Sequence, residues 1–204
     1  MRHSNRKKTN SIFMMCCLLS IISPVIYAQD TTAVGQPALF SGYDPGPTYP
    51  FGRPHPEAPP EIRQFDFMIG ECECTDSLRQ PDGSWRTMSS KWNAAYFLNG
   101  QGIQDQYWAD NFATSNIRIF DRNSGTWKVT FFKKPGYSSG VWEGGKEGET
   151  MVMKQKATSP TGREGTSRLT FYNIRKEGYD WKGEFVDKET GQAFPFWKTS
   201  CLKK

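Results

Sequence analysis

Apolar and polar residues alternate over short segments from Gly70 to the end of the sequence, with turn residues between the segments. The segments are rich in aromatic and β-branched residues. Asp-Gly, Asn-Gly or Ser-Gly pairs recur between them about every ten residues, as in β-hairpins. The pattern predicts about ten antiparallel strands in up-and-down order. They cover residues 71–78, 85–98, 103–110, 115–120, 126–132, 141–145, 150–157, 167–174, 179–186 and 192–202.

A meander of this length leaves two unpaired sheet edges, and closure into a barrel is the simplest way to pair them. The predicted fold class is therefore all-β, a closed antiparallel barrel in which the first and last strands can be neighbours. The one helical candidate is PPEIRQFDFMI, residues 59–69. We expect it to form a short helical turn before the first strand that plugs one end of the barrel.

The chain before the barrel has two parts of different composition. Residues 1–28 combine a positively charged start, an apolar core broken by Pro24 and a small residue, Ala28, before the polar Gln29. This arrangement is typical of a secretory signal peptide. Residues 29–63 are rich in proline and glycine without periodicity, so we expect an extended leader that does not fold by itself. Residues 64–204 are then one barrel domain, long enough to bury a core.

Removal of the expected signal peptide changes the charge of the protein. Residues 1–28 hold four of the 26 lysines and arginines and none of the 21 acidic residues, so the remainder has 22 positive and 21 negative side chains, a net charge of +1. Such a balance gives no reason to expect binding to nucleic acid or to an acidic membrane surface. No other apolar run is long enough to cross a bilayer as a helix, so we expect a soluble protein, exported to the periplasm or the cell exterior.

Three cysteines outside the signal peptide raise the question of a crosslink. Cys72 and Cys74, in GECECT, lie on one face of the first expected strand. Their Cα atoms would be about 6.6 Å apart with parallel Cβ vectors, so they should not pair with each other. Cys201 lies on the last expected strand, where a disulfide to Cys74 or Cys72 would join the two ends of the sheet. Export favours oxidation, and we prefer Cys74 as the partner of Cys201 because it lies further from the glycine at which the strand begins. Three free buried thiols are the alternative.

Four stretches resemble successive strands of the uncharacterised domain-of-unknown-function 1579 family, which belongs with the lipocalin-like (calycin) barrels. They are FDFMIGECEC, AAYFLNGQGIQDQYW, IRIFDRNSGTWKVTFF and VWEGGKEGETMVMKQ, and the likeness runs from about Phe65 to Lys204. The resemblance implies a lipocalin-like barrel with a cavity and implies no particular reaction. Related barrels usually have a tryptophan two residues after the glycine, where this chain has Cys72. Trp85 and Trp92 are the candidates to close the barrel end instead.

The positions of the histidines exclude several kinds of site. His3 lies in the expected signal peptide and His55 in the leader, so residues 64–204 contain none. A Ser-His-Asp or Cys-His nucleophilic site within the barrel is therefore excluded, and a haem held by a proximal histidine is unsupported. Zinc would need the three cysteines and a carboxylate, whereas three thiolates could hold Cu(I). We favour the disulfide over either metal, and predict neither a metal site nor a cofactor.

Three carboxylates are bracketed by aromatic residues in the sequence: Asp105 in QDQYW, Glu143 in VWEGG and Glu184 in KGEFV. One of them could be a buried general acid with a raised pKa. Together with a tyrosine such as Tyr107 or Tyr172, it could serve an isomerase or a cyclase. Outward-facing charges on alternating strands are the simpler interpretation, so catalysis is the second hypothesis.

Aromatic side chains are the most informative feature of the expected strands. Several pairs on one strand are separated by an even number of residues and therefore share a face. A barrel of eight to ten strands has room for packed side chains or for one small ligand. We expect the rings to line a cavity for a small apolar or amphipathic molecule; a filled barrel with a structural role in the cell envelope is the third hypothesis. The expected ligand-binding residues are Trp92, Tyr96, Tyr107, Trp127, Phe131, Trp142, Trp181 and Phe185.

Overall fold

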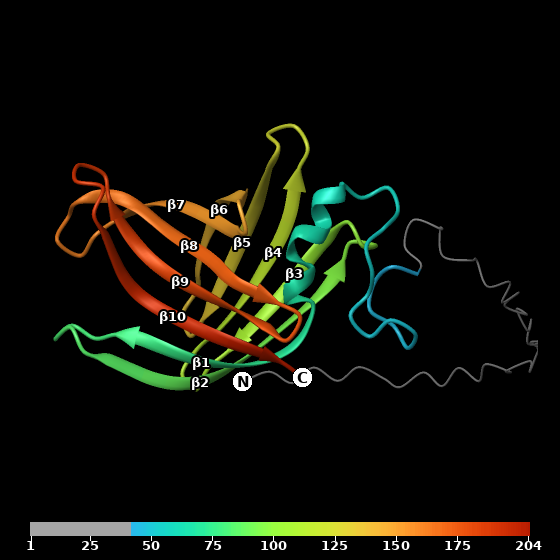
Figure 1. The fold of residues 1–204 in the computed structure, drawn as a ribbon, viewed down its shortest axis with the longest axis horizontal. Helices are drawn as coiled ribbons and strands as arrows, with labels where there is room; N and C mark the ends of the chain where they lie inside the picture. The colour runs from blue at the N-terminus through green and yellow to red at the C-terminus, as the bar shows by residue number, and fades with distance from the viewer. Residues whose placement is uncertain (1–41) are drawn as a thin grey trace, which may run out of the picture. The chain divides into compact units, whose positions relative to one another are not determined.

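Ten antiparallel strands close into one barrel in the computed structural model (Figure 1). The structure describes residues 42–204, so the expected signal peptide and the start of the leader lie outside the described residues. The strands are β1 (Gly70–Arg79), β2 (Trp85–Phe97), β3 (Gly102–Trp108), β4 (Ala113–Asp121), β5 (Thr126–Lys134), β6 (Ser138–Glu147), β7 (Thr150–Thr158), β8 (Glu164–Arg175), β9 (Gly178–Asp187) and β10 (Ala193–Lys203). Each strand pairs with the next along the chain, and β1 pairs with β10 to complete the ring. The predicted all-β, up-and-down barrel is confirmed.

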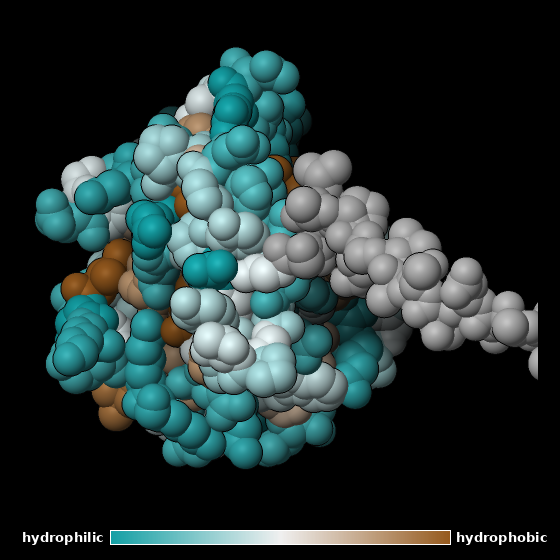
Figure 2. Space-filling model, turned by 90° about the vertical axis from the view of Figure 1, so that its right-hand side faces the viewer, coloured by the Kyte–Doolittle hydropathy of each residue, from teal (hydrophilic) through white to brown (hydrophobic). Residues whose placement is uncertain are grey.

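Alternation along each strand decides which side chains enter the barrel. On β1, Cys72, Cys74 and Asp76 are buried, whereas Glu71 and Glu73 are exposed. This period of two is the geometry of a strand with one face on the core. The side of the molecule seen in Figure 2 is mostly hydrophilic, with hydrophobic side chains gathered mainly toward the left of the view. The two cysteines therefore share a face, as the sequence predicted, and the structure turns that face inward.

The sixth strand is longer than the five residues 141–145 that the sequence pattern predicted. β6 spans Ser138–Glu147, because its first residues continue the ladder with β5 as far as the pair Lys133 and Ser138. The extra positions at this end are Ser138, Ser139 and Gly140, and glycine has low strand propensity. Cross-strand hydrogen bonding supplied by β5 therefore extends β6 beyond its own local preference.

A disulfide joins the first strand to the last. Cys74 lies directly opposite Cys201 in the β1–β10 ladder, and the two residues are bonded. Cys72, two residues earlier on the same face, is a free and buried thiol. Burial raises the pKa of Cys72, although the positive charge of Lys203 and a hydrogen bond with Tyr179 act in the opposite direction. The preferred pairing of Cys74 with Cys201 is thus found in the structure.

A nine-residue 3-10 helix, η2 (Pro60–Met68), plugs one end of the barrel. It begins with proline, whose fixed φ and missing N–H suit the first helical position. Its side chains Ile62, Phe65 and Met68 are buried, and the Phe65 ring lies edge-on to Trp127 of β5 with centroids 4.8 Å apart. The helical turn predicted for residues 59–69 is confirmed, and it packs against β4 and β9.

The tryptophan that packs against this plug is Trp127, not either of the two candidates from the sequence. Trp92 packs instead against Tyr107 and Trp181 inside the barrel. Trp85 lies at the start of β2, whereas the far end of β2 contacts the plug through Tyr96 and Asp66.

No helix among residues 42–204 has the length and apolar character needed to span a membrane.

The described part of the leader, residues 42–59, is irregular and is held to the end of β2. The Tyr96 N–H donates to the carbonyl of Phe51 at 2.9 Å, and the His55 N–H donates to the carbonyl of Gly100 at 3.0 Å. Gly100 has a φ of +74°, and a Cβ atom there would collide with the backbone of residues 53 and 55. Only glycine allows this close approach. The boundary expected between residues 63 and 64 falls inside η2.

Candidate ligand cavity

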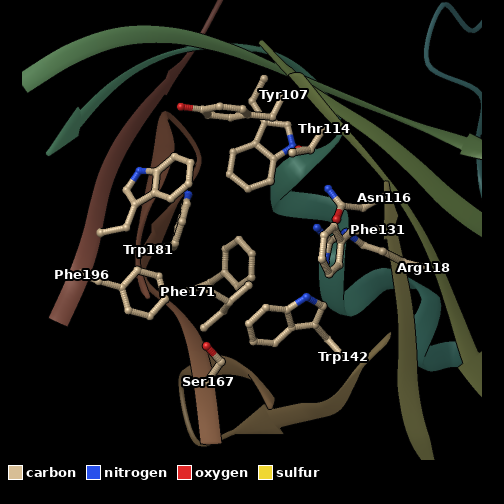
Figure 3. A pocket seen from close by; sticks show the side chains of 13 residues that line it. Tyr107, Thr114, Asn116, Arg118, Phe131, Trp142, Ser167, Phe171, Trp181 and Phe196 are labelled. Carbon is tan, nitrogen blue, oxygen red and sulfur yellow. The ribbon is translucent and has the colours of Figure 1, made fainter. Parts of the chain in front are cut away.

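A cavity of about 200 Å³ lies inside the barrel, and two of its lining residues, Arg118 and Phe171, also contact Phe65 of the plug (Figure 3). Side chains from eight of the ten strands line it, and most of its surface is aromatic. Its wall is made by Trp92, Tyr107, Thr114, Asn116, Arg118, Phe131, Trp142, Ser167, Leu169, Phe171, Trp181, Phe196 and Trp197.

Two strands supply three lining residues each, and both do so at every second position. β4 contributes Thr114, Asn116 and Arg118, and β8 contributes residues 167, 169 and 171. Since alternate side chains of a strand point to the same face, these runs are consecutive inward positions. The cavity wall is therefore chemically asymmetric, because β4 presents polar side chains and β8 presents mostly apolar ones.

Five of the eight aromatic residues predicted to bind a ligand meet in this cavity. They come from five different strands, so the closed barrel is what brings them together. Figure 3 shows the rings turned toward a common space. The five are Trp92, Tyr107, Phe131, Trp142 and Trp181.

The other three predicted residues lie outside the cavity. Trp127 shares a face with Phe131, but four residues of strand place it about 13 Å away, among the residues at the plug. There it is fully buried, and its Nε1–H donates to Gln64 of η2 at 3.0 Å. Tyr96 also lies at the plug, where its hydroxyl donates to Asp66. Phe185 lies in a groove at the opposite end of the barrel.

This outer groove adjoins the cavity. It lies between the β1–β2 and β7–β8 turns, and two residues, Ser167 and Phe196, line both spaces. Phe185 and Phe194 contribute apolar surface to it, and Phe194 and Phe196 are exposed. The groove is therefore the natural route by which a molecule could reach the cavity.

The most polar part of the cavity wall is Arg118. Its Nε–H donates to Asp105 Oδ2 at 2.7 Å, and both side chains are almost fully buried. The other carboxylate oxygen, Oδ1, accepts from Trp92 Nε1 at 2.9 Å and from Asn116 Nδ2 at 2.6 Å. Asp105 itself does not line the cavity. Asp105 therefore stands behind Arg118, and its oxygens are already occupied by donors.

The guanidinium of Arg118 is also held by aromatic rings. Its carbon Cζ lies 4.8 Å from the centroid of Phe65 and 5.8 Å from that of Phe171. A ring face attracts a cation at such distances. The plug residue Phe65 thereby helps to fix the arginine that reaches the cavity wall.

A second buried carboxylate, Asp76, supports the cavity from behind. Its side chain accepts four hydrogen bonds, from Tyr107 and Trp197 at 2.9 Å each and from Ser90 and Thr199 at 2.5 Å each. Tyr107 and Trp197 are wall residues, so Asp76 fixes the position of two rings. Burial, and in addition the negative charge of Asp76, raises the pKa of Tyr107 far above its ordinary value.

The remaining predicted carboxylates do not reach the cavity. Glu143 is exposed and forms a surface ion pair with Lys128, with Nζ 2.7 Å from the carboxylate. Glu184 is buried but is bound by Arg168 and Lys182 at 2.9 Å and 3.1 Å. Burial raises the pKa of Glu184, but these two cationic partners outweigh it, and the pKa lies below its ordinary value. Tyr172, the other suggested partner for catalysis, lines a separate groove beside η2.

Sequence reasoning missed both Arg118 and Asp76. Asp76 follows Cys72 and Cys74 at even spacing, so the cysteine argument already implied that it shares their face. Arg118 gave no such signal, since it stands between Ile117 and Ile119, and simple alternation would turn the isoleucines inward. The structure does the reverse: Arg118 is 3% exposed and Ile119 is 38% exposed.

The disulfide rules out the Cu(I) site that the three cysteines could have formed as free thiolates. With Cys74 and Cys201 bonded, only Cys72 retains a thiol among the described residues. No cluster of three histidine, cysteine or acidic side chains in residues 42–204 is arranged to hold a metal ion.

Comparison with known proteins gives little beyond this geometry. No protein-family model matches the chain, and no curated protein matches it. Among solved structures, the S-type phycobiliprotein lyase CPES from Guillardia theta aligns with 8% identity and a TM-score of 0.42, covering 70% of this chain and 91% of the lyase. So low a score carries no argument about fold or function. The resemblance to the domain-of-unknown-function 1579 family stays a prediction.

The wall chemistry resembles that of small-molecule binding sites. No carboxylate, histidine or thiol of the described residues lines the cavity. The tyrosine that does, Tyr107, has its hydroxyl proton hydrogen-bonded to Asp76. Aromatic rings with a few placed polar groups are the usual composition of a small-molecule site.

Proposed function

We propose that this protein is an exported carrier or sensor that binds one small apolar or amphipathic molecule inside its barrel. The observation that carries the proposal is the aromatic cavity itself, in which rings from different strands surround an unfilled space with polar groups on one wall. A barrel interior needed only for stability would be packed to the normal density of protein cores.

The size of the cavity limits the ligand. An apolar cavity of about 150 Å³ is enough to hold benzene. A volume of about 200 Å³ therefore suits a molecule with one or two rings, or a short branched chain. A longer molecule would have to extend past Ser167 and Phe196 into the outer groove, which is itself apolar.

The two alternative hypotheses have less support. An isomerase or cyclase would need an acid or base facing its substrate, and both buried carboxylates near the cavity, Asp76 and Asp105, stand behind the wall with their oxygens occupied. A purely structural barrel would not need the space. Binding is the function that requires both the space and the polar wall.

Tryptophan fluorescence tests the proposal directly, because four of the seven tryptophans line the cavity. Titration with a panel of fatty acids, isoprenoids and flat aromatic compounds should give a saturable change with at least one of them. Trp142→Phe should remove much of that change, whereas Trp108→Phe, which alters an exposed ring, should not. If no compound in the panel changes the fluorescence or the melting temperature, the structural hypothesis replaces the carrier.

Export is the second part of the proposal. It is supported by the signal-peptide pattern of residues 1–28 and by the Cys74–Cys201 disulfide, since such bonds persist mainly in oxidising compartments. Intact-mass measurement on protein secreted by its native host should give a chain that begins at Gln29. A chain that retains residues 1–28 and remains in the cytosol would contradict export.

A further inference from the structure

We infer that the molecule bound in the cavity is a small monocarboxylate with an aromatic or apolar body, and that Arg118 binds its carboxylate. This inference rests on the proposed function and names the ligand class. It is carried by hydrogen-bond donors on the cavity wall that have no acceptor within the described part of the protein.

Arg118 has the largest unmet hydrogen-bonding capacity on the wall. A guanidinium carries five N–H donors. Only the Nε–H finds an acceptor, at Asp105, while neither terminal nitrogen has a hydrogen-bond partner among residues 42–204. The side chain is nonetheless 96% buried and lines the cavity. Buried charged groups are normally paired and fully hydrogen-bonded, so these free donors need an acceptor inside the cavity.

A second free donor lies across the cavity. Trp181 is 6% exposed, and its Nε1–H is buried without a partner in the described residues. Arg118 is on β4 and Trp181 is on β9, which stand five strands apart in either direction around the ring. Figure 3 shows the two side chains on facing walls. An acceptor beside Trp181 would satisfy this donor, while the donors of Arg118 lie on the opposite wall.

The charge arrangement favours an anion over a neutral acceptor. Asp105 balances Arg118 from behind and does not line the cavity, so the positive end of the ion pair faces the empty space. No carboxylate on the wall would repel an anionic ligand. A planar guanidinium also matches a carboxylate geometrically, since two parallel N–H donors meet its two oxygens.

The arginine is preorganised for this contact. Hydrogen bonding to Asp105 and the rings of Phe65 and Phe171 hold the guanidinium in place before any ligand arrives. Preorganised groups lose little conformational freedom on binding, which favours affinity. The rest of the wall is aromatic, so the body of the ligand must be apolar.

Isothermal titration calorimetry of the folded protein with 1-naphthoate and with 1-naphthamide tests the inference. The two probes share a two-ring body and differ in charge. We expect naphthoate to bind about ten- to a hundredfold more tightly, the ratio typical of a charge-assisted hydrogen bond in a buried site. The double variant Arg118→Met/Asp105→Asn removes the charges as a pair and leaves no unpaired buried ion. It should lose the preference for naphthoate and keep the affinity for naphthamide.

Two further variants control for indirect effects. Lys128→Met/Glu143→Gln removes an exposed ion pair outside the barrel and should leave both affinities unchanged. Arg118→Lys keeps the charge but loses the two-pronged geometry, so it should retain only part of the preference. It also provides a test if the double variant fails to fold.

The outcomes separate the inference from the proposed function. Equal binding of the two probes, or a naphthoate preference that survives in the double variant, would overturn the carboxylate anchor while leaving the binding function intact. If neither probe binds while another compound of the fluorescence panel does, the carboxylate anchor is overturned and the binding function stands; if no compound of the panel binds either, both are contradicted.

Discussion

Cys74 lies directly opposite Cys201 across the seam between β1 and β10, with their Cα atoms 4.1 Å apart. The bond between them spans 127 residues of sequence and covalently closes the ring of strands. Every other strand is connected to its neighbour by a hairpin, so this seam is the one place in the described barrel where no short turn holds two adjacent strands together. The disulfide takes the place of that turn.

Removal of the disulfide should therefore lower the stability of the barrel substantially. We expect Cys74→Ala/Cys201→Ala to reduce the free energy of unfolding by about 2–5 kcal/mol, because the bond restricts the unfolded chain over a long loop. Urea denaturation measures the change. Cys72→Ala, which removes the neighbouring free thiol from the same face, should cost clearly less. Peptide mapping that links Cys72 instead of Cys74 to Cys201 would contradict this assignment.

Asp76 should be essential to the wall of the cavity. Asp76→Leu would leave the four donors of Tyr107, Trp197, Ser90 and Thr199 without their acceptor. Because each unsatisfied buried donor costs about 1–3 kcal/mol, we expect a loss of at least about 3 kcal/mol in unfolding free energy. The exposed Glu143→Gln should change stability by less than about 0.5 kcal/mol. A loss no larger for Asp76→Leu than for Glu143→Gln would show that the cluster contributes little.

The outer groove should be the route to the cavity. Ser167 lines both spaces, so Ser167→Trp should obstruct the passage and fill part of the cavity. We expect binding of any cavity ligand to weaken more than tenfold, measured by calorimetry. Thr166→Trp, at the neighbouring outward position of β8, should leave affinity unchanged. An unaltered affinity and association rate in Ser167→Trp would mean that ligands enter elsewhere.

Stability should fall in acid partly because of Glu184. The folded state lowers the pKa of Glu184, since the stabilising effect of Arg168 and Lys182 exceeds the effect of burial. A carboxyl group with a lower pKa in the folded state contributes stability above its unfolded pKa, about 4.3, and loses that contribution as the pH falls through the folded value. Glu184→Gln should therefore flatten the pH dependence of stability below about pH 4.5. Urea midpoints measured from pH 3 to pH 7 test this, and a profile with an unchanged slope would contradict it.

Local patterns along the chain predict the strands, their order and the faces of several of them. Turn residues at regular intervals mark the hairpins, and the shared face of Cys72 and Cys74 follows from a spacing of two. These properties are local, since turn chemistry depends on a few adjacent residues and alternation is a fixed property of extended backbone. Closure of the sheet then placed the first and last strands together, and with them the two cysteines of the disulfide.

The height of each ring along the barrel was decided only by the tertiary structure. Trp127 and Phe131 share a strand and a face, yet Trp127 packs against Phe65 of the plug and Phe131 lines the cavity. Alternation specifies a face and carries no information about depth. Depth depends on where η2 enters the barrel, and that position is set by contacts between residues far apart in sequence.

Tertiary structure also decided which residues of β4 face inward. Local hydrophobicity would bury Ile117 and Ile119, but Arg118 is buried in their place because the ladders with β3 and β5 fix the register of this strand. Asp105 on β3 and the ring of Phe65 then provide the partners that a buried guanidinium needs. The cost of burying a charge depends on partners brought in from other strands, and a pattern read along a single strand does not contain them.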